Sequence, residues 1–228
     1  MDSCFCFSME RSVKRETLPI YRCNDRNEIA NCASIVRCGG VIVFPTDTVY
    51  GIGCSPYNDR AVERVFQIKG RNRACPFPVL AANLHDIEKI VSLGKIGRKL
   101  ASVFWPGGLT LVCKIENSDI SKNVRAGQST IGVRIPNNEC VIGLLKYCRY
   151  LVGTSANVSG MTSPRSVSEI LSSSLRGFDA VLDGGSTKEG QESTIIDISR
   201  DFPQIIREGA IPLTQIKSAV SEELSKDS

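Results

Sequence analysis

GGVIVFPTDTVYG (residues 39–51), followed by KGRNR (residues 69–73), is the part of this chain from which its architecture can be read. The apolar run Val41 to Phe44 predicts a buried strand that ends in hydroxyls and a carboxylate. A helix between Asp59 and Gly70 then brings three cations within about one turn of its end. Because ligand-binding residues concentrate in loops at strand ends, this pattern favours a small polar substrate that carries phosphates.

Short strands and helices alternate on both sides of this stretch, which predicts one α/β domain over residues 20–220. Short connections such as residues 183–185 leave no room for a helical crossover everywhere, so a mixed sheet is expected. Strands are predicted at residues 41–44, 78–82, 109–115, 130–135, 151–154, 180–182, 193–198 and 204–207. Besides helices near residues 24–39 and 59–70, helices are predicted at 84–91, 96–104, 139–147, 167–175 and 213–224. Residues 1–19 are expected to be a disordered N-terminal segment, and 221–228 a frayed C-terminus.

Composition excludes several classes of site. The net charge of +4, with no run of five basic residues, is too weak to argue for nucleic-acid binding by itself. There are ten cysteines but no Cys-x-x-Cys pair, and His85 is the single histidine, so neither a zinc site nor a Cys/His nucleophile pair is supported. The thiols are expected to be small core residues in a reducing compartment.

The ends of the chain carry no targeting signal that we can identify. Residues 1–9 lack a basic segment and have too short an apolar run for a signal peptide. No stretch approaches the length needed to span a membrane. A cytoplasmic protein without membrane contact is therefore expected.

Polar clusters recur at the ends of the predicted strands, and each allows two interpretations. Residues 153–160, with Ser163 and Arg165 after them, offer hydroxyls and amides to a ligand, or they form a helix N-cap and a turn. Lys69 and Arg71 could bind phosphates or simply complement the dipole of a helix C-terminus. The hydroxyls of residues 46 and 48 could bind a ligand or cap the next segment.

Arg134 stands in the middle of an otherwise apolar strand, residues 130–135, and so needs a partner. Alternation places Thr130, Gly132 and Arg134 on one face of that strand. The guanidinium could form a structural ion pair, or it could bind a ligand carboxylate with two hydrogen bonds. Two weaker clusters follow at residues 191–195 and 207–209.

Taken together, these clusters resemble the YrdC/Sua5 family of L-threonylcarbamoyladenylate synthases in its short, single-domain form. The resemblance covers about residues 29–216. Its motifs occur in family order: PTDTVYG at 45–51, K-x-R at 69–71, WPG-x-LT at 105–110, VRIP at 133–136, SAN at 155–157, DGG at 183–185 and STI at 193–195. The resemblance implies a twisted mixed sheet flanked by helices, with a large basic concave site.

The implied reaction converts L-threonine, bicarbonate or carbon dioxide, and ATP into threonylcarbamoyl-AMP and pyrophosphate. The product would serve modification of adenosine 37 in tRNA through a downstream threonylcarbamoyl transferase, and direct tRNA binding by this chain stays open. Mg²⁺ is expected to arrive with ATP, with no metal ligands from protein side chains.

The resemblance also assigns roles to individual residues. The catalytic core would be Lys69, Arg71, Ser155 and Asn157. L-Threonine would be held by Thr46, Arg134, Ser155 and Ser193, with Arg134 on its carboxylate. ATP would be held by Lys69, Arg73, Thr130, Asn157, Ser163 or Arg165, and Arg207. Because a carbamate is already anionic, positioning and electrostatics could supply most of the catalysis without a general base.

Two other functions fit the same sequence less well. An RNA-binding module would explain a basic concave face, but aromatic residues are few and no stacking motif occurs. A carbamoyl-adenylating enzyme of the hydrogenase-maturation type would use carbamoyl phosphate. The acylphosphatase and zinc-finger segments of that protein have no counterpart in this sequence.

Overall fold

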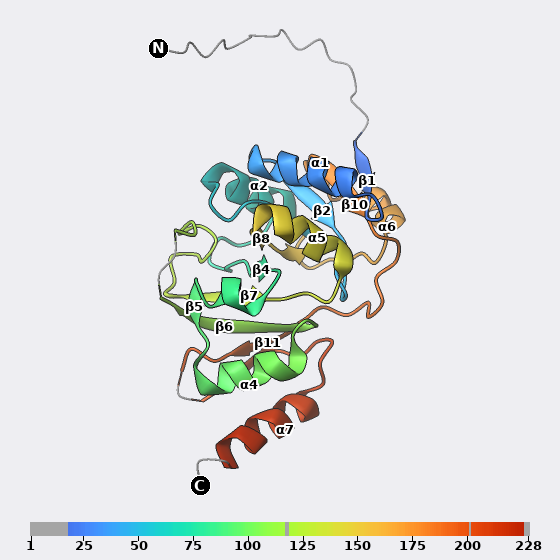
Figure 1. Ribbon diagram of the computed structural model, residues 1–228. Helices are drawn as coiled ribbons and strands as arrows, with labels where there is room; N and C mark the ends of the chain where they lie inside the picture. The colour runs from blue at the N-terminus through green and yellow to red at the C-terminus, as the bar shows by residue number, and fades with distance from the viewer. Residues whose placement is uncertain (1–17, 117–118, 201, 226–228) are drawn as a thin grey trace, which may run out of the picture.

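Two mixed β-sheets form the framework of the computed structural model, which describes residues 18–116, 119–200 and 202–225 (Figure 1). Sheet A has the strand order β1-β10-β2-β3-β9, and sheet B the order β12-β11-β6-β7-β4-β8, with β5 paired to β6. Both sheets combine parallel and antiparallel pairs. The strands are β1 (Ile20–Arg22), β2 (Ile42–Phe44), β3 (Gly51–Gly53), β4 (Val79–Ala81), β5 (Val91–Ser92), β6 (Leu109–Ile115), β7 (Thr130–Arg134), β8 (Tyr150–Val152), β9 (Thr154–Ser155), β10 (Ala180–Asp183), β11 (Thr194–Asp197) and β12 (Gln204–Arg207).

Helices cover the outer faces of the sheets. In Figure 1, α1 and α5 lie side by side, with α1 against strands of sheet A and α5 against β4 and β8 of sheet B, and α4 and α7 lie together beside sheet B at the other end of the molecule. The helices are α1 (Arg26–Arg37), α2 (Asp59–Lys69), α3 (Leu84–Ile87), α4 (Gly94–Phe104), α5 (Glu139–Cys148), α6 (Val167–Ser172) and α7 (Leu213–Leu224). Apolar side chains on one face of each long helix form the two hydrophobic clusters of the core.

Helix α2 shows how local sequence sets the position of a site residue. Asn58 caps its first turn, because the side-chain oxygen accepts a hydrogen bond from the amide of Ala61 at 3.0 Å. Gly70 ends the helix with φ of 57°, a left-handed conformation that glycine adopts without a steric penalty. Lys69 is therefore the last helical residue, and the chain turns away directly after it.

The prediction of a mixed α/β fold is confirmed, although the strands divide between two sheets where one was expected. The predicted segments at 109–115, 204–207 and 213–224 match β6, β12 and α7 in their bounds. Helix α7 thus includes residues 221–224, while residues 1–17 and 226–228 of the two predicted end segments lie outside the described residues. Strand β3 was not predicted because two of its three residues are glycine. Those glycines allow close approach, since a Cβ on Gly53 would lie 1.6 Å from the carbonyl oxygen of Val152.

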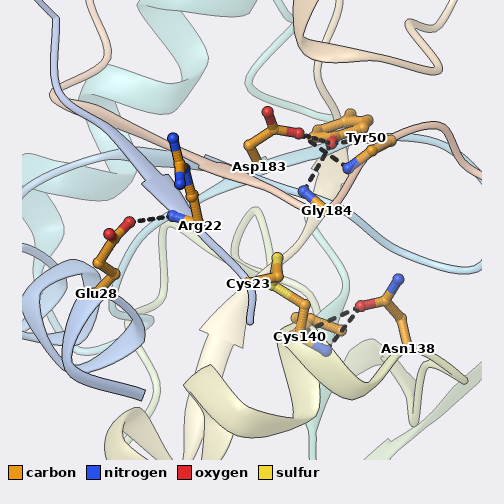
Figure 2. The surroundings of a disulfide bond; sticks show 10 residues. Arg22, Cys23, Glu28, Tyr50, Asn138, Cys140, Asp183 and Gly184 are labelled. Carbon is orange, nitrogen blue, oxygen red and sulfur yellow. Dashed lines mark hydrogen bonds between the residues drawn. A yellow bond between two sulfur atoms is a disulfide. The ribbon is translucent and has the colours of Figure 1, made fainter. Parts of the chain in front are cut away.

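One disulfide joins Cys23, directly after β1, to Cys140 in the first turn of α5 (Figure 2). The expectation that the thiols are reduced core residues is therefore wrong for this pair. The two cysteines have a sequence separation of 117, so no local spacing could have indicated the bond. Cys32 and Cys54 do fit the expectation, because they are free and buried, and burial raises the pKa of each thiol to about 12.

A buried ion pair links the two sheets. Asp47 lies in the loop from β2 to β3 of sheet A, and its Oδ1 lies 2.7 Å from Nη2 of Arg134, the last residue of β7 in sheet B. Both side chains are almost wholly buried, with 6% and 7% of their surface exposed. The same Oδ1 accepts a hydrogen bond from the amide of Asn137 at 3.1 Å. The sequence left open whether Arg134 forms a structural ion pair, and the structure contains that pair.

Among the described residues, no helix has the combination of length and apolar character that a membrane crossing requires.

Removing the disulfide should destabilise the fold. A cross-link that closes a long loop typically contributes about 2–4 kcal/mol by restricting the unfolded chain. We expect the free energy of unfolding in denaturant to fall by about that amount in Cys140→Ser. Cys38→Ser, which changes an exposed free cysteine, is the matched control and should leave it unchanged. Equal stability of Cys140→Ser and the unmodified protein under oxidising conditions would contradict the role of the bond.

Removing Asp47 should be costly, because it leaves the buried Arg134 guanidinium without its counter-ion. We expect Asp47→Ala to lower the free energy of unfolding by about 3–5 kcal/mol. Glu88→Ala breaks an exposed pair with Arg98 and should cost only about 0–1 kcal/mol. Denaturant melts of the two variants measure the difference, and similar losses would show that the buried pair does not hold the sheets together.

Candidate active site

A cavity of about 600 Å³ opens over sheet B, beside the loop from β2 to β3. This size lies within the range of small-molecule sites. Its walls come from the end of α2 and the loop after it, from strands β6, β7, β11 and β12, and from β9 with the turn that follows. Segments far apart in the sequence therefore meet in one hollow, as the sequence predicted.

Most of the predicted site residues line this cavity. They are Thr46, Lys69, Arg71, Thr130, Arg134, Ser155, Asn157, Ser193 and Arg207. Arg73, Ser163 and Arg165 are not among the lining residues. Arg73 is exposed and pairs with Glu63 on α2, while Ser163 reaches the cavity indirectly, through a hydrogen bond to Glu192.

The loop from β2 to β3 is ordered by its own hydroxyls. Oγ1 of Thr46 donates to the carbonyl of Val49 at 2.6 Å and accepts from the amide of Thr48 at 3.2 Å. The Thr48 hydroxyl in turn accepts from Nη1 of Arg134 at 3.0 Å. The sequence left open that the Thr46 hydroxyl caps its own segment, and the structure shows these local hydrogen bonds. Both threonines also line the cavity.

Lys69 is buried, with only 1% of its surface exposed, so the interpretation as a solvated helix end is wrong for this residue. Its Nζ donates to the carbonyls of Ser155 and Asn157, the latter at 2.8 Å, and lies 3.2 Å from Oδ1 of Asn157. Burial, and secondarily the charge of Arg71, lower the Lys69 pKa to about 8. The ammonium thus fixes the turn after β9 against the end of α2.

The turn after β9 is further held by its own side chains. Oγ of Ser155 donates to Oδ1 of Asn157 at 2.6 Å, and Nδ2 of Asn157 donates to the carbonyl of Met161. The sequence left open that this segment is a helix N-cap and a turn. The turn is present, but the residues directly after Ser155 do not begin a helix.

Arg71 supports the loop that follows α2. Its Nε and Nη2 donate to the carbonyls of Cys75 and Pro76, both at 3.1 Å. The guanidinium also lies 5.2 Å from the ring centre of Phe77. Arg71 therefore gives a defined path to residues 72–77, several of which line the cavity.

Side chains on the cavity face of sheet B form rows across the strands. In one row Arg207 of β12 lies beside Ile195, then Thr110 of β6, which neighbours the β7 position of Arg134. The Thr110 hydroxyl lies 2.9 Å from Oγ of Ser193. In the next row Val112 lies beside Gly132, which has no side chain and leaves the floor of the cavity low. Asp197 of β11 lies on the other side of Val112, so this second row has a carboxylate at one end and a low floor at the other.

Three polar residues of the site were missed by sequence reasoning as functional residues. Asp47 and Thr110 stand inside motifs that the sequence analysis quoted, and Glu192 directly precedes another. No spacing signal distinguishes the two carboxylates from ordinary loop residues, since their cationic partners are distant in sequence: Arg134 for Asp47, and Arg207 for Glu192.

Comparisons with known proteins agree with this geometry. The family model for Sua5, YciO and YrdC proteins, described as telomere recombination, matches residues 34–209. A threonylcarbamoyl-AMP synthase of Pyrococcus abyssi is 33% identical over 86% of this chain and 58% of the relative. One of Bacillus subtilis is 31% identical over 85% of this chain and 56% of the relative. This chain therefore spans a little over half the length of these curated relatives.

A solved structure shares the fold as well. The crystal structure of P. abyssi Sua5 complexed with L-threonine superposes with a TM-score of 0.85 at 31% identity, over 91% of this chain and 62% of that one. The family model matches most of the chain and the fold agrees with it, so the chain belongs to the Sua5/YciO/YrdC family.

Proposed function

We propose that this chain is an L-threonylcarbamoyladenylate synthase, a nucleotidyltransferase that condenses L-threonine, bicarbonate or carbon dioxide, and ATP. The observation that carries the proposal is one cavity in which Lys69, Arg71, Arg134 and Arg207 converge with serine and threonine hydroxyls. The names of the relatives, and the L-threonine in the P. abyssi structure, support the same activity.

The chemistry requires positioning and charge neutralisation. The threonine nitrogen forms a bond to the carbon of carbon dioxide or bicarbonate, and in the second case water leaves. An oxygen of the resulting carbamate attacks the α-phosphorus, and the bond to the β-phosphate bridge oxygen breaks to release pyrophosphate. Both reactants are anions, so fixed cations and hydrogen-bond donors lower the barrier to their approach.

The lining residues divide between the two substrates in the way that the family resemblance implies. Around Arg134, the hydroxyls of Thr46, Ser155 and Ser193 would hold L-threonine. A guanidinium has five N–H donors, and three of those of Arg134 bind Gly107, Thr48 and Asp47. A substrate carboxylate would accept from the remaining donors and so would share Arg134 with Asp47.

ATP would be held by Lys69, Thr130, Asn157 and Arg207, which line the same cavity. Ser163 would act through its hydrogen bond to Glu192 on the cavity wall. Arg73 and Arg165 do not line the cavity and would have to move to reach a bound nucleotide. Mg²⁺ would accompany ATP and supply neutralisation of the phosphates. Glu192 and Asp197 are the cavity carboxylates among the described residues, and both already accept hydrogen bonds, so the donor set suits an ion carried by the triphosphate.

The place of this reaction in tRNA modification belongs to the same proposal. The product is a mixed anhydride that a downstream threonylcarbamoyl transferase would consume. A cytoplasmic location and direct tRNA binding stay predictions.

The direct test is pyrophosphate release from ATP. We expect release that depends on both L-threonine and bicarbonate, with threonylcarbamoyl-AMP detected by mass spectrometry. Carbamoyl phosphate in place of threonine and bicarbonate is the control reaction and should release no pyrophosphate above background. Release with carbamoyl phosphate alone, or tRNA binding without any threonine-dependent release, would overturn the proposal in favour of the alternatives.

ATP binding should weaken as pH rises through about 8. Lys69 is charged below its lowered pKa and neutral above it. Its three N–H groups already have protein acceptors, so its charge would act on a phosphate through space, and a unit charge a few ångströms away contributes about 1–4 kcal/mol. We therefore expect the Kd of ATP, measured without threonine between pH 7 and 9.5, to rise roughly tenfold. Lys69→Met should bind ATP weakly with no such pH dependence. A flat profile for the unmodified protein would remove Lys69 from the phosphate site.

A further inference from the structure

Glu192 places a negative charge among the groups that are expected to bind phosphates. Its Oε1 accepts a hydrogen bond from Oγ of Ser163 at 2.6 Å, and its Oε2 forms an ion pair with Nη1 of Arg207. The Ser155 hydroxyl and the charge of Lys69 also act on the carboxylate and, with Ser163 and Arg207, hold its pKa below the usual value against the effect of burial. Glu192 is therefore ionised at neutral pH, and it contacts Ser163 and Arg207, two residues assigned to ATP.

An ionised carboxylate in this position has two opposite effects on a nucleotide. Before a nucleotide binds, it orients the hydroxyl and the guanidinium that phosphates require. Once phosphates arrive, it repels them and competes for the same donors. The competition is direct at Arg207, which lines the cavity and would hold ATP, whereas Ser163 reaches the cavity through Glu192.

Arg207 is held on two sides, by Glu192 at Nη1 and by a backbone carbonyl at its other edge. Its Nε and Nη2 donate to the carbonyl of Ser193 at 3.2 and 2.8 Å, from the side away from Nη1. Only the Nη1 contact involves Glu192. A phosphate oxygen can therefore replace the carboxylate at Nη1 without loss of the backbone contacts that fix the guanidinium.

We propose that Glu192 is a positioning residue of the nucleotide site, an internal anion that orients Ser163 and Arg207 in the empty cavity and is displaced by the phosphates of the nucleotide. The inference rests on the proposed function, because it requires a nucleotide in this cavity. It assigns no role to Glu192 in proton transfer.

Glu208 provides a matched control. It carries the same charge and follows Arg207 directly in sequence, but its side chain is exposed and it does not line the cavity. Glu192→Gln and Glu208→Gln therefore remove one negative charge each, from inside and from outside the site. Glutamine also keeps an oxygen that can accept from Ser163, so the first variant removes the charge and preserves the shape.

The test measures the Kd of AMP, ADP and ATP by calorimetry, without Mg²⁺ and without threonine. We expect Glu192→Gln to bind ATP about tenfold tighter than the unmodified protein, with a smaller gain for ADP and the smallest for AMP, because the removed repulsion grows with the number of phosphates. Glu208→Gln should change all three values by less than about twofold. Glu192→Ala should gain less than Glu192→Gln, because it also loses the orientation of Ser163 and Arg207.

Other outcomes overturn one idea or the other. Unchanged or weaker ATP binding by a folded Glu192→Gln, or an equal shift for all three nucleotides, contradicts the displaced-anion role while leaving nucleotide binding intact. Thermal unfolding of each variant shows whether it is folded, and a Glu192→Gln protein that cannot fold would mean that the carboxylate is structural. Absence of ATP binding by the unmodified protein instead contradicts the proposed function itself.

Discussion

The buried ion pair between Asp47 and Arg134 is the contact that gives the cavity its shape. It crosses from the loop after β2 in sheet A to the end of β7 in sheet B, and both side chains are almost wholly buried. Burial of two charges is compensated only when geometry is good and further hydrogen bonds are made. Here the carboxylate also accepts from the Asn137 amide, and the guanidinium donates to Gly107 and Thr48. The loop that carries Thr46 is thereby fixed against sheet B.

Like Arg134, the other cations on the cavity wall are held in place by groups of the protein itself. The cations of the cavity each have protein acceptors: carbonyls for Lys69 and Arg71, and carboxylates for Arg134 and Arg207. Preorganised charges of this kind lower the cost of reorganisation when a charged substrate arrives. The disulfide lies close to the end of the same loop (Figure 2). Cys23 is next to Gly184, and the Gly184 amide donates to the hydroxyl of Tyr50, the last residue of the loop, at 3.1 Å.

Much of the fold could be predicted from local patterns, and the remainder depends on distant contacts. Strand β6, with the sequence LTLVCKI, is a long and mostly apolar run, so its bounds were clear from sequence. Strand β3 has no such pattern, because its glycines serve to bring neighbouring backbones close. The hydroxyls and cations that line the cavity were named through the family resemblance, together with their positions at the ends of predicted strands and of the helix at residues 59–70. The carboxylates Asp47 and Glu192 were not, because an acid beside an expected anion site is unfavourable until its cationic partner is known.

These two carboxylates have the same kind of partner and different surroundings, which separates their roles. Asp47 is enclosed, and its pair with Arg134 cannot be exchanged without exposing a buried charge. The pair of Glu192 with Arg207 is partly exposed, with 29% and 40% of the two side chains open, and it lies on the wall of the cavity. An exposed pair contributes little net stability, so a ligand anion can replace it at small cost. Burial, rather than charge, therefore decides which ion pair supports the framework and which one can yield to a substrate.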